Sequence, residues 1–164
     1  MPAILPVMSF FSCLGSTRKK TPDKPAYYHI DHDYPLQLAQ IASANGMKQF
    51  HLVSSIGANP AAAGFYLRLK GETERDIAAV PFYATHIYRP SFLDGKREEQ
   101  RLLEKVSLAL MRVINPVFGG RWKKYRSIQV TAVARAMLRQ SLQDTSGVHY
   151  YESGEIQALA DRRE

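Results

Sequence analysis

The chain has 164 residues, which is enough for one domain with a sizeable core and too few for two. Its hydrophobic content of 45%, its charged content of 23% and its single cysteine are typical of a globular domain without an intrachain disulfide, so we expect a cytoplasmic protein. The net charge of +7 is spread along the sequence, with two short basic clusters and no DNA- or RNA-binding motif, which argues against specific nucleic-acid binding.

The apolar stretch 1–14 is too short to span a membrane, and it lacks the basic start of a signal peptide. We expect residues 7–13 to form a buried parallel strand, with Gly15, Ser16 and Thr17 in the loop at its carboxyl end. Such loops border the ligand crevice in open α/β sheets, but a Gly-Ser-Thr turn also forms without any ligand. The residues alone leave both interpretations open.

Residues 29–33 place two histidines and two aspartates together, a composition that a metal site also has. No further ligand with suitable spacing accompanies them. We therefore favour a helix start in which Asp31 or Asp33 is the N-cap and Pro35 lies in the first turn, and we predict no metal. The helix then continues to a stop at Asn45-Gly46, a pair typical of helix C-termini.

A short run of strand-forming residues, 49–54, follows this helix and ends in the hydroxyls of Ser54 and Ser55. A strand, a helix and a strand of these lengths predict two parallel strands with a right-handed connection. The loop 56–64, rich in glycine, proline and alanine, then leads to a second helix.

Residues 65–79 have the pattern of a helix on which Tyr66 and Lys70 lie one turn apart, so both side chains leave the same face. A phenol is a poor acid or base near neutral pH, because its ordinary pKa is about 10. A neighbouring ammonium group favours the phenolate, and Ser55 is placed to hydrogen-bond a substrate oxygen. The alternative is an interfacial tyrosine beside a solvated lysine, since this spacing is common.

We expect this helix to bury its apolar side and to leave its charged residues, Glu72, Glu74, Arg75 and Asp76, largely solvated. The remaining predicted elements follow in chain order: a strand at 83–89 ended by Pro90, a charged loop at 94–100, a helix at 99–114, a basic loop at 119–125, a helix within 128–142, a strand at 148–151 and a helical turn at 155–160. In the basic loop, Trp122 and Tyr125 are candidate pocket residues, but we favour a simple surface loop.

A series of motifs occurs in the order found in one known family. They are Cys13-Leu14-Gly15-Ser16-Thr17-Arg18, Leu52-Val53-Ser54-Ser55-x-Gly57, Tyr66-Leu67-x-x-Lys70-Gly71-Glu72-x-Glu74, Tyr88-Arg89-Pro90-Ser91 and the stretch 130–137. Together they closely resemble the Tat-interacting-protein oxidoreductase-like branch of the atypical short-chain dehydrogenases/reductases, a family related to NAD-dependent epimerases and dehydratases. The resemblance spans nearly the whole chain.

This resemblance implies an oxidoreductase that binds NADP or NAD and acts on a small-molecule substrate by carbonyl or alcohol redox chemistry. It implies Ser55, Tyr66 and Lys70 as catalytic residues, with Tyr66 as acid and base. For Arg89, a salt bridge to a nearby carboxylate is the alternative to a place near the nicotinamide. The implied cofactor contacts are Gly15, Ser16, Thr17, Ser54, Tyr66, Lys70, Arg89 and Pro90.

The sequence lacks the Gly-rich turn with which a dinucleotide-binding domain begins, G-x-G-x-x-G or a relative. We therefore expect residues 1–164 to form a single, partial Rossmann-like α/β domain, a parallel sheet with flanking helices, without the first βαβαβ half. Cofactor binding would then be weakened or lost, and the strand near Val7 would become an exposed edge that favours self-association. The alternative function is that of a truncated, catalytically inactive relative that acts through protein contacts.

Overall fold

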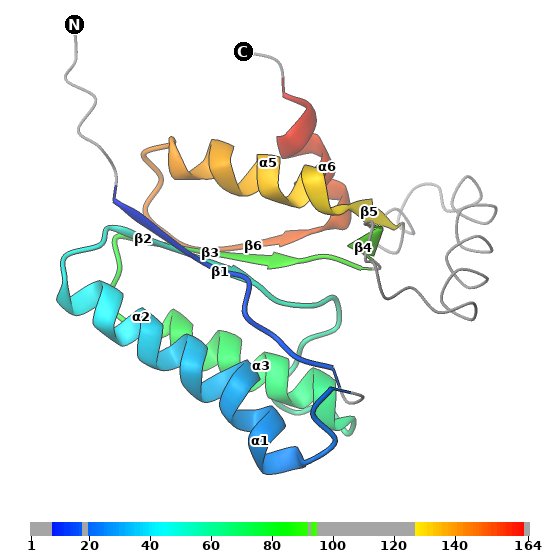
Figure 1. Ribbon diagram of the computed structural model, residues 1–164. Coiled ribbons are helices and arrows are strands. Elements are labelled where there is room, and N and C mark those ends of the chain that lie inside the picture. Colours follow the sequence, from blue (N-terminus) through cyan, green and yellow to red (C-terminus); the bar gives the residue numbers. More distant parts are fainter. Residues whose placement is uncertain (1–7, 18–19, 92, 95–126, 163–164) are drawn as a thin grey trace, which may run out of the picture.

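The computed structural model describes residues 8–17, 20–91, 93–94 and 127–162, and these form an α/β fold (Figure 1). Its centre is a four-stranded parallel sheet in the order β1-β2-β3-β6. This confirms the predicted fold class and each of the predicted strands. The strands are β1 (Ser9–Ser12), β2 (Gln49–Val53), β3 (Ala84–Arg89) and β6 (Gly147–Glu152).

Helices lie on both sides of the sheet (Figure 1). One side carries α1 (Lys24–Tyr28), the π-helical η1 (His29–Asp33), α2 (Tyr34–Ala44) and α3 (Phe65–Ala78), and the other carries α5 (Val130–Ser141) and α6 (Ser153–Asp161). A second, small sheet pairs β4 (Leu93–Asp94) with β5 (Ile128–Gln129), which the sequence did not predict. Among the described residues, no helix is both long and apolar enough to cross a membrane.

Some sequence predictions lie outside the described residues. These are most of the charged loop at 94–100, the helix at 99–114, and the basic loop at 119–125 with Trp122 and Tyr125. They stay predictions.

The helical stretch before β2 begins earlier than its sequence signals indicated. Asp23 caps α1, since its side chain accepts a hydrogen bond of 2.9 Å from the Ala26 N–H. Asp33 occupies the position before α2, and Pro35 lies in the first turn of that helix, as the sequence predicted. The side chain of Asp33 makes no capping hydrogen bond there, however, because the chain is already helical at η1. The predicted end is confirmed, since Gly46 follows the last turn with a φ of +77°.

Alternation of side chains along the strands creates a separate core on each face of the sheet. The α2/α3 face packs Phe50, Leu52 and Ile87 of the strands with Ala39 and Ile77 of the helices. Because both faces are covered, a ligand reaches the sheet at its strand ends. The core on the α5/α6 face consists of Tyr88, Ile128, Ala132, Val133, Ala136, Met137, Ile156, Leu159 and Ala160.

A row of stacked rings, which we call the ring ladder, crosses the α5/α6 face of the sheet. It runs from Phe11 on β1 through His51 and His86 to His149 on β6, residues that are paired across neighbouring strands. Successive ring centroids lie 4.7, 4.6 and 5.2 Å apart. Burial, and then the charge of the next imidazole, lowers the pKa of His51 to about 3 and that of His86 to about 4. Both rings are therefore neutral in the folded protein near neutral pH.

β1 is an edge strand of the sheet in the part of the chain that the structure describes. The ring of Phe11, which ends the ring ladder on this strand, is 43% exposed. The sequence predicted this edge position for the strand. Self-association through the edge stays a prediction.

Candidate functional site

The carboxyl ends of β1, β2 and β3 meet at one edge of the parallel sheet, which is where α/β folds bind ligands. The loop 15–17 follows β1, Ser54 and Ser55 follow β2, and Arg89 ends β3 just before Pro90. The fold therefore gathers at one edge all the strand-end residues that the sequence predicted for the site.

Tyr66 and Lys70 share one face of α3, as their spacing predicted. The Lys70 Nζ lies 6.0 Å from the centre of the Tyr66 ring. Their surroundings differ, because Tyr66 is 42% exposed whereas Lys70 is only 7% exposed. A lysine buried to this extent needs a partner for its charge, so the solvated lysine of the alternative interpretation is excluded.

The partner of Lys70 is Asp31 in η1. Its Oδ2 lies 2.8 Å from the Lys70 Nζ, and Asp31 is 1% exposed. Sequence reasoning missed this role because it treated Asp31 as a helix cap. The one sequence signal is that Lys70 follows Leu69 on the inward side of α3, where a charge has to be paired.

The loop after β1 closes over this ion pair. The Ser16 N–H donates a hydrogen bond of 2.6 Å to Asp31 Oδ1, and the Tyr27 hydroxyl donates one of 2.9 Å to the Ser16 carbonyl. A Cβ at Gly15 would lie 3.3 Å from Asp31 Oδ2 and 3.5 Å from Lys70 Nζ, so glycine permits the close approach. Burial first, and the charge of Asp31 second, raises the pKa of Tyr27 to about 12. Gly15 and Ser16 are thus joined to Lys70 through Asp31.

The other predicted hydroxyl-bearing residues are bonded within their own loops or to the neighbouring strand. The Thr17 carbonyl accepts hydrogen bonds of 2.9 Å from two later N–H groups and so closes a turn. The Ser54 N–H donates to the Tyr88 carbonyl at 2.7 Å, while its buried hydroxyl has no hydrogen-bond partner among the described residues. The Ser55 hydroxyl donates to the neighbouring Ile56 carbonyl at 3.4 Å. The structure therefore brings Tyr66 to Lys70 but leaves Ser55 bonded to its own loop.

Arg89 is bound by Glu74 of α3. Its Nε donates to Glu74 Oε1 at 3.0 Å, and its guanidinium lies 4.5 Å from the centre of the Tyr150 ring. The salt-bridge interpretation of Arg89 is confirmed. The prediction that Glu74 is solvated is wrong, since it is 2% exposed and β3 presents a guanidinium to it. Pro90 ends the strand, and its carbonyl accepts a hydrogen bond of 3.0 Å from the Ile56 N–H.

No family model matches the chain, but curated proteins are similar to most of it. Protein FMP52-1, mitochondrial, of Scheffersomyces stipitis is 32% identical over 163 residues, which cover 92% of this chain and 69% of that protein. Protein FMP52, mitochondrial, of Candida glabrata is 35% identical over 170 residues, which cover 97% and 72%. Protein HTATIP2 of Rattus norvegicus is 34% identical over 137 residues, which cover 84% of this chain and 54% of that protein.

Solved structures share the fold. The Bordetella bronchiseptica enzyme WbmG in complex with NAD has a TM-score of 0.61 at 13% identity, over 94% of this chain and 54% of that one. A putative NAD-dependent epimerase/dehydratase from Bacillus halodurans has a TM-score of 0.61 at 18% identity, over 94% and 69%. The fold is thus that of Rossmann-type epimerases, of which this chain spans little more than half to about two thirds.

Identities of 32% and 35% over nearly the whole chain, and over 69% and 72% of the respective relatives, are too extensive for a local likeness. The strand-end residues and the Tyr66–Lys70 pair lie within this region of similarity. The chain belongs to the FMP52/HTATIP2 family, an atypical short-chain dehydrogenase/reductase family related to NAD-dependent epimerases and dehydratases.

Proposed function

We propose that this chain binds NADP or NAD and performs the carbonyl or alcohol redox chemistry of a short-chain dehydrogenase, with Tyr66 as acid and base. One observation supports this most directly: the Lys70 amine lies 6.0 Å from the Tyr66 ring and against the Gly15 loop, at the carboxyl ends of parallel strands. Tyr66 is the proposed group that exchanges a proton with a substrate oxygen. Ser55 is the proposed hydrogen-bond donor to that oxygen.

Two features of this edge fit a dinucleotide. Gly15 leaves space where a side chain would press on the Asp31–Lys70 pair, and the buried Ser54 hydroxyl has no partner among the described residues. A bound nicotinamide supplies or accepts a hydride. Lys70 would hold the ribose hydroxyls, and the remaining contacts proposed from the family resemblance are Gly15, Ser16, Thr17, Ser54, Tyr66, Arg89 and Pro90.

Titration of the folded protein with NADPH and NADH, followed by nicotinamide fluorescence, tests this proposal. Binding should saturate, and Lys70→Met should weaken it. Tyr66→Phe should keep binding but lower turnover of a panel of aldehydes and ketones by about a hundredfold or more, because the ring stays and the proton is lost. Tyr34→Phe is the control, because Tyr34 is also an exposed tyrosine but lies on α2, and its binding and turnover should match those of the wild type. Folded wild-type protein that shows no saturable binding at millimolar cofactor refutes the proposal.

The second candidate is a catalytically inactive relative that acts through protein contacts. The Asp31–Lys70 ion pair favours it, because the amine that would serve the cofactor already has a partner at 2.8 Å. Asp31→Asn distinguishes the two functions. If the pair blocks a working site, the variant gains cofactor affinity, whereas an inactive relative binds no cofactor in either form.

Self-association through β1 and a cytoplasmic location are also proposals. Sedimentation velocity of the wild type should show dimers or larger species. Phe11→Lys should convert them to monomers, since a charged edge disfavours strand pairing. Monomeric wild type would contradict this. Two of the relatives carry the word mitochondrial in their names, so cell fractionation, with mitochondrial and cytoplasmic markers, is the test of location.

A further inference from the structure

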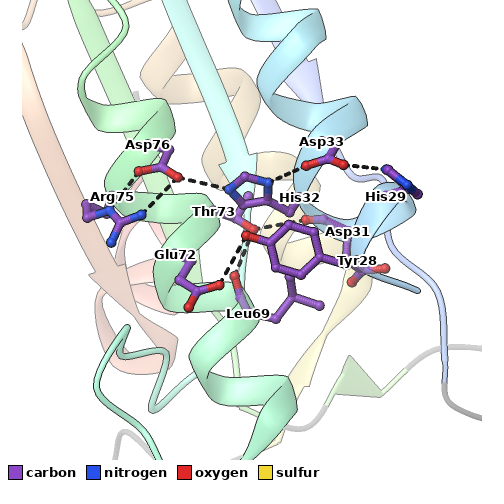
Figure 2. Close-up of polar contacts among 10 residues, drawn as sticks. All are labelled: Tyr28, His29, Asp31, His32, Asp33, Leu69, Glu72, Thr73, Arg75 and Asp76. Carbon is purple, nitrogen blue, oxygen red and sulfur yellow. Dashed lines mark hydrogen bonds and ion pairs between the residues drawn. The ribbon is translucent and has the colours of Figure 1, made fainter. Parts of the chain in front are cut away.

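A second polar cluster, which the proposed chemistry does not use, joins η1 to α3 (Figure 2). His32 lies at its centre. Its Nδ1 is 2.7 Å from Asp33 Oδ1, and its Nε2 is 3.0 Å from Asp76 Oδ2. Asp33 also contacts His29, and Asp76 also binds Arg75. We call His32, Asp33 and Asp76 the histidine clamp.

Both ring nitrogens of His32 face carboxylates. A carboxylate only accepts hydrogen bonds, so both contacts are hydrogen bonds only when both nitrogens carry a proton. A neutral ring has one bare nitrogen, whose lone pair would face a carboxylate oxygen. The side chain of His32 is 8% exposed, so water does not readily replace a lost partner. The histidine clamp is closed when His32 is cationic and open on one side when it gives up a proton.

The carboxylates of the clamp are held in their ionised forms. The hydrogen bond from His32 lowers the pKa of Asp33. Arg75 first, and His32 after it, lowers the pKa of Asp76. Each carboxylate thus receives donors from two residues. The other charged or titratable groups around the clamp are Tyr28 of α1, His29 and Asp31 of η1, and Lys70, Glu72 and Arg75 of α3.

The histidine clamp adjoins the ion pair of the candidate site. Asp31 precedes His32 in η1, and Thr73, which lies between Lys70 and Asp76 on α3, donates to the Asp31 backbone carbonyl at 3.1 Å (Figure 2). The Thr73 hydroxyl has one proton, which it shares with the Leu69 carbonyl at 2.8 Å. The contacts of η1 with α3 at this point are therefore the Asp31 carbonyl and, one residue later, the His32 ring. The place of that carboxylate depends on how closely η1 packs against α3.

We propose that His32 is a positioning residue: its doubly protonated ring holds η1 against α3 and so sets how firmly Asp31 retains the Lys70 amine. Loss of one proton loosens η1 and makes the amine more available to a ligand. An effect of His32 on cofactor affinity rests on the proposed function, whereas its effect on the availability of the Lys70 amine does not.

Trace acetylation with acetic anhydride, read by peptide mass spectrometry, measures the reactivity of each lysine. The ratio of Lys70 to Lys48 labelling removes the common effect of pH on amines. In wild type this ratio should rise about fivefold with increasing pH, which corresponds to one ordinary hydrogen bond. In His32→Gln the ratio should be high at every pH and nearly constant.

His29→Gln is the matched control, because His29 lies on the same π-helical turn and contacts the same Asp33, but its side chain is 62% exposed. It should keep the wild-type rise. Asp76→Ala removes the α3 end of the clamp at a partly exposed position. It should give the same high and nearly constant ratio as His32→Gln, and it takes the place of that variant if His32→Gln does not fold. A flat ratio in wild type, or an unchanged rise in both clamp variants, overturns the proposal.

Cofactor affinity measured on the same proteins separates this proposal from the proposed function. If the Lys70-to-Lys48 labelling ratio changes with pH in a folded protein that binds no cofactor, the proposed role of His32 is supported and the proposed oxidoreductase function is refuted. A cofactor that binds equally to wild type and His32→Gln, with unchanged labelling in both, refutes the clamp alone.

Discussion

The ring ladder predicts that the protein loses stability in mild acid. His51 and His86 are neutral when folded, since their pKa values are about 3 and about 4, against an ordinary value of 6.5. In the unfolded chain both rings take up a proton as the pH falls below 6.5. The unfolded state then binds more protons than the folded state. The stabilisation is therefore complete above that pH and is lost progressively as the pH falls toward the folded values.

The magnitude follows from proton linkage. At about pH 5 the unfolded imidazole is almost fully protonated, whereas the folded one is still neutral. Relative to about pH 7, the loss is about 2 kcal/mol for each histidine and about 4 kcal/mol for both. This is a large part of the total stability of about 5 to 15 kcal/mol that is typical of a domain. A charge inside the ladder would lie between neighbouring rings in the absence of water, which is why the folded protein resists protonation there.

Urea denaturation followed by circular dichroism at these two pH values measures the effect. His86→Leu removes one titrating ring and should reduce the pH dependence by about 2 kcal/mol. Ile87→Val, the next residue on β3, is the control and should cost about 1 kcal/mol equally at both pH values. Equal stability of the wild type at the two pH values, or an unchanged pH dependence in His86→Leu, would refute the reasoning.

Two further predictions concern the packing around α3. A Cβ at Gly71 would lie 2.2 Å from the backbone of Asn59, so Gly71→Ala should lower the thermal midpoint and cost about 1 to 3 kcal/mol, whereas Gly154→Ala, with nothing within 4 Å, should cost far less. Equal midpoints for the two variants would contradict the close approach. Asp31→Ala leaves the Lys70 charge buried and unpaired, and in urea denaturation it should cost about 3 to 5 kcal/mol. Adding Lys70→Met should recover most of that loss, and no recovery would show that the ion pair is not the cause.

Local signals were sufficient for the elements whose ends are determined by neighbouring residues. Gly46 marked the end of α2, and the strand formers after it marked β2. The spacing of Tyr66 and Lys70 was enough to put both on one face of α3. Local signals were not sufficient for η1, because a π-helical turn has no composition of its own and depends on how the helix fits its neighbours.

The partners of the buried charges could not be read from the sequence, because packing decides them. Asp31 had the features of a helix cap and Glu74 those of a solvated residue, yet each is buried against a cation of another element. The helical pattern of one segment does not say which segment packs on it. The joint action of Ser55 and Tyr66 stays a prediction for the same reason, since it depends on how a loop and a helix approach each other.

Two ion pairs of opposite sense hold α3 in place. The helix contributes the cation Lys70 to Asp31 of η1, and the anion Glu74 to Arg89 of β3. Replacing a single member of either pair leaves a buried, unpaired charge, which costs more stability than replacing both members with apolar residues. Single substitutions at any of these four positions should therefore be poorly tolerated. A homologue that differs at one position of a pair should differ at the other position as well.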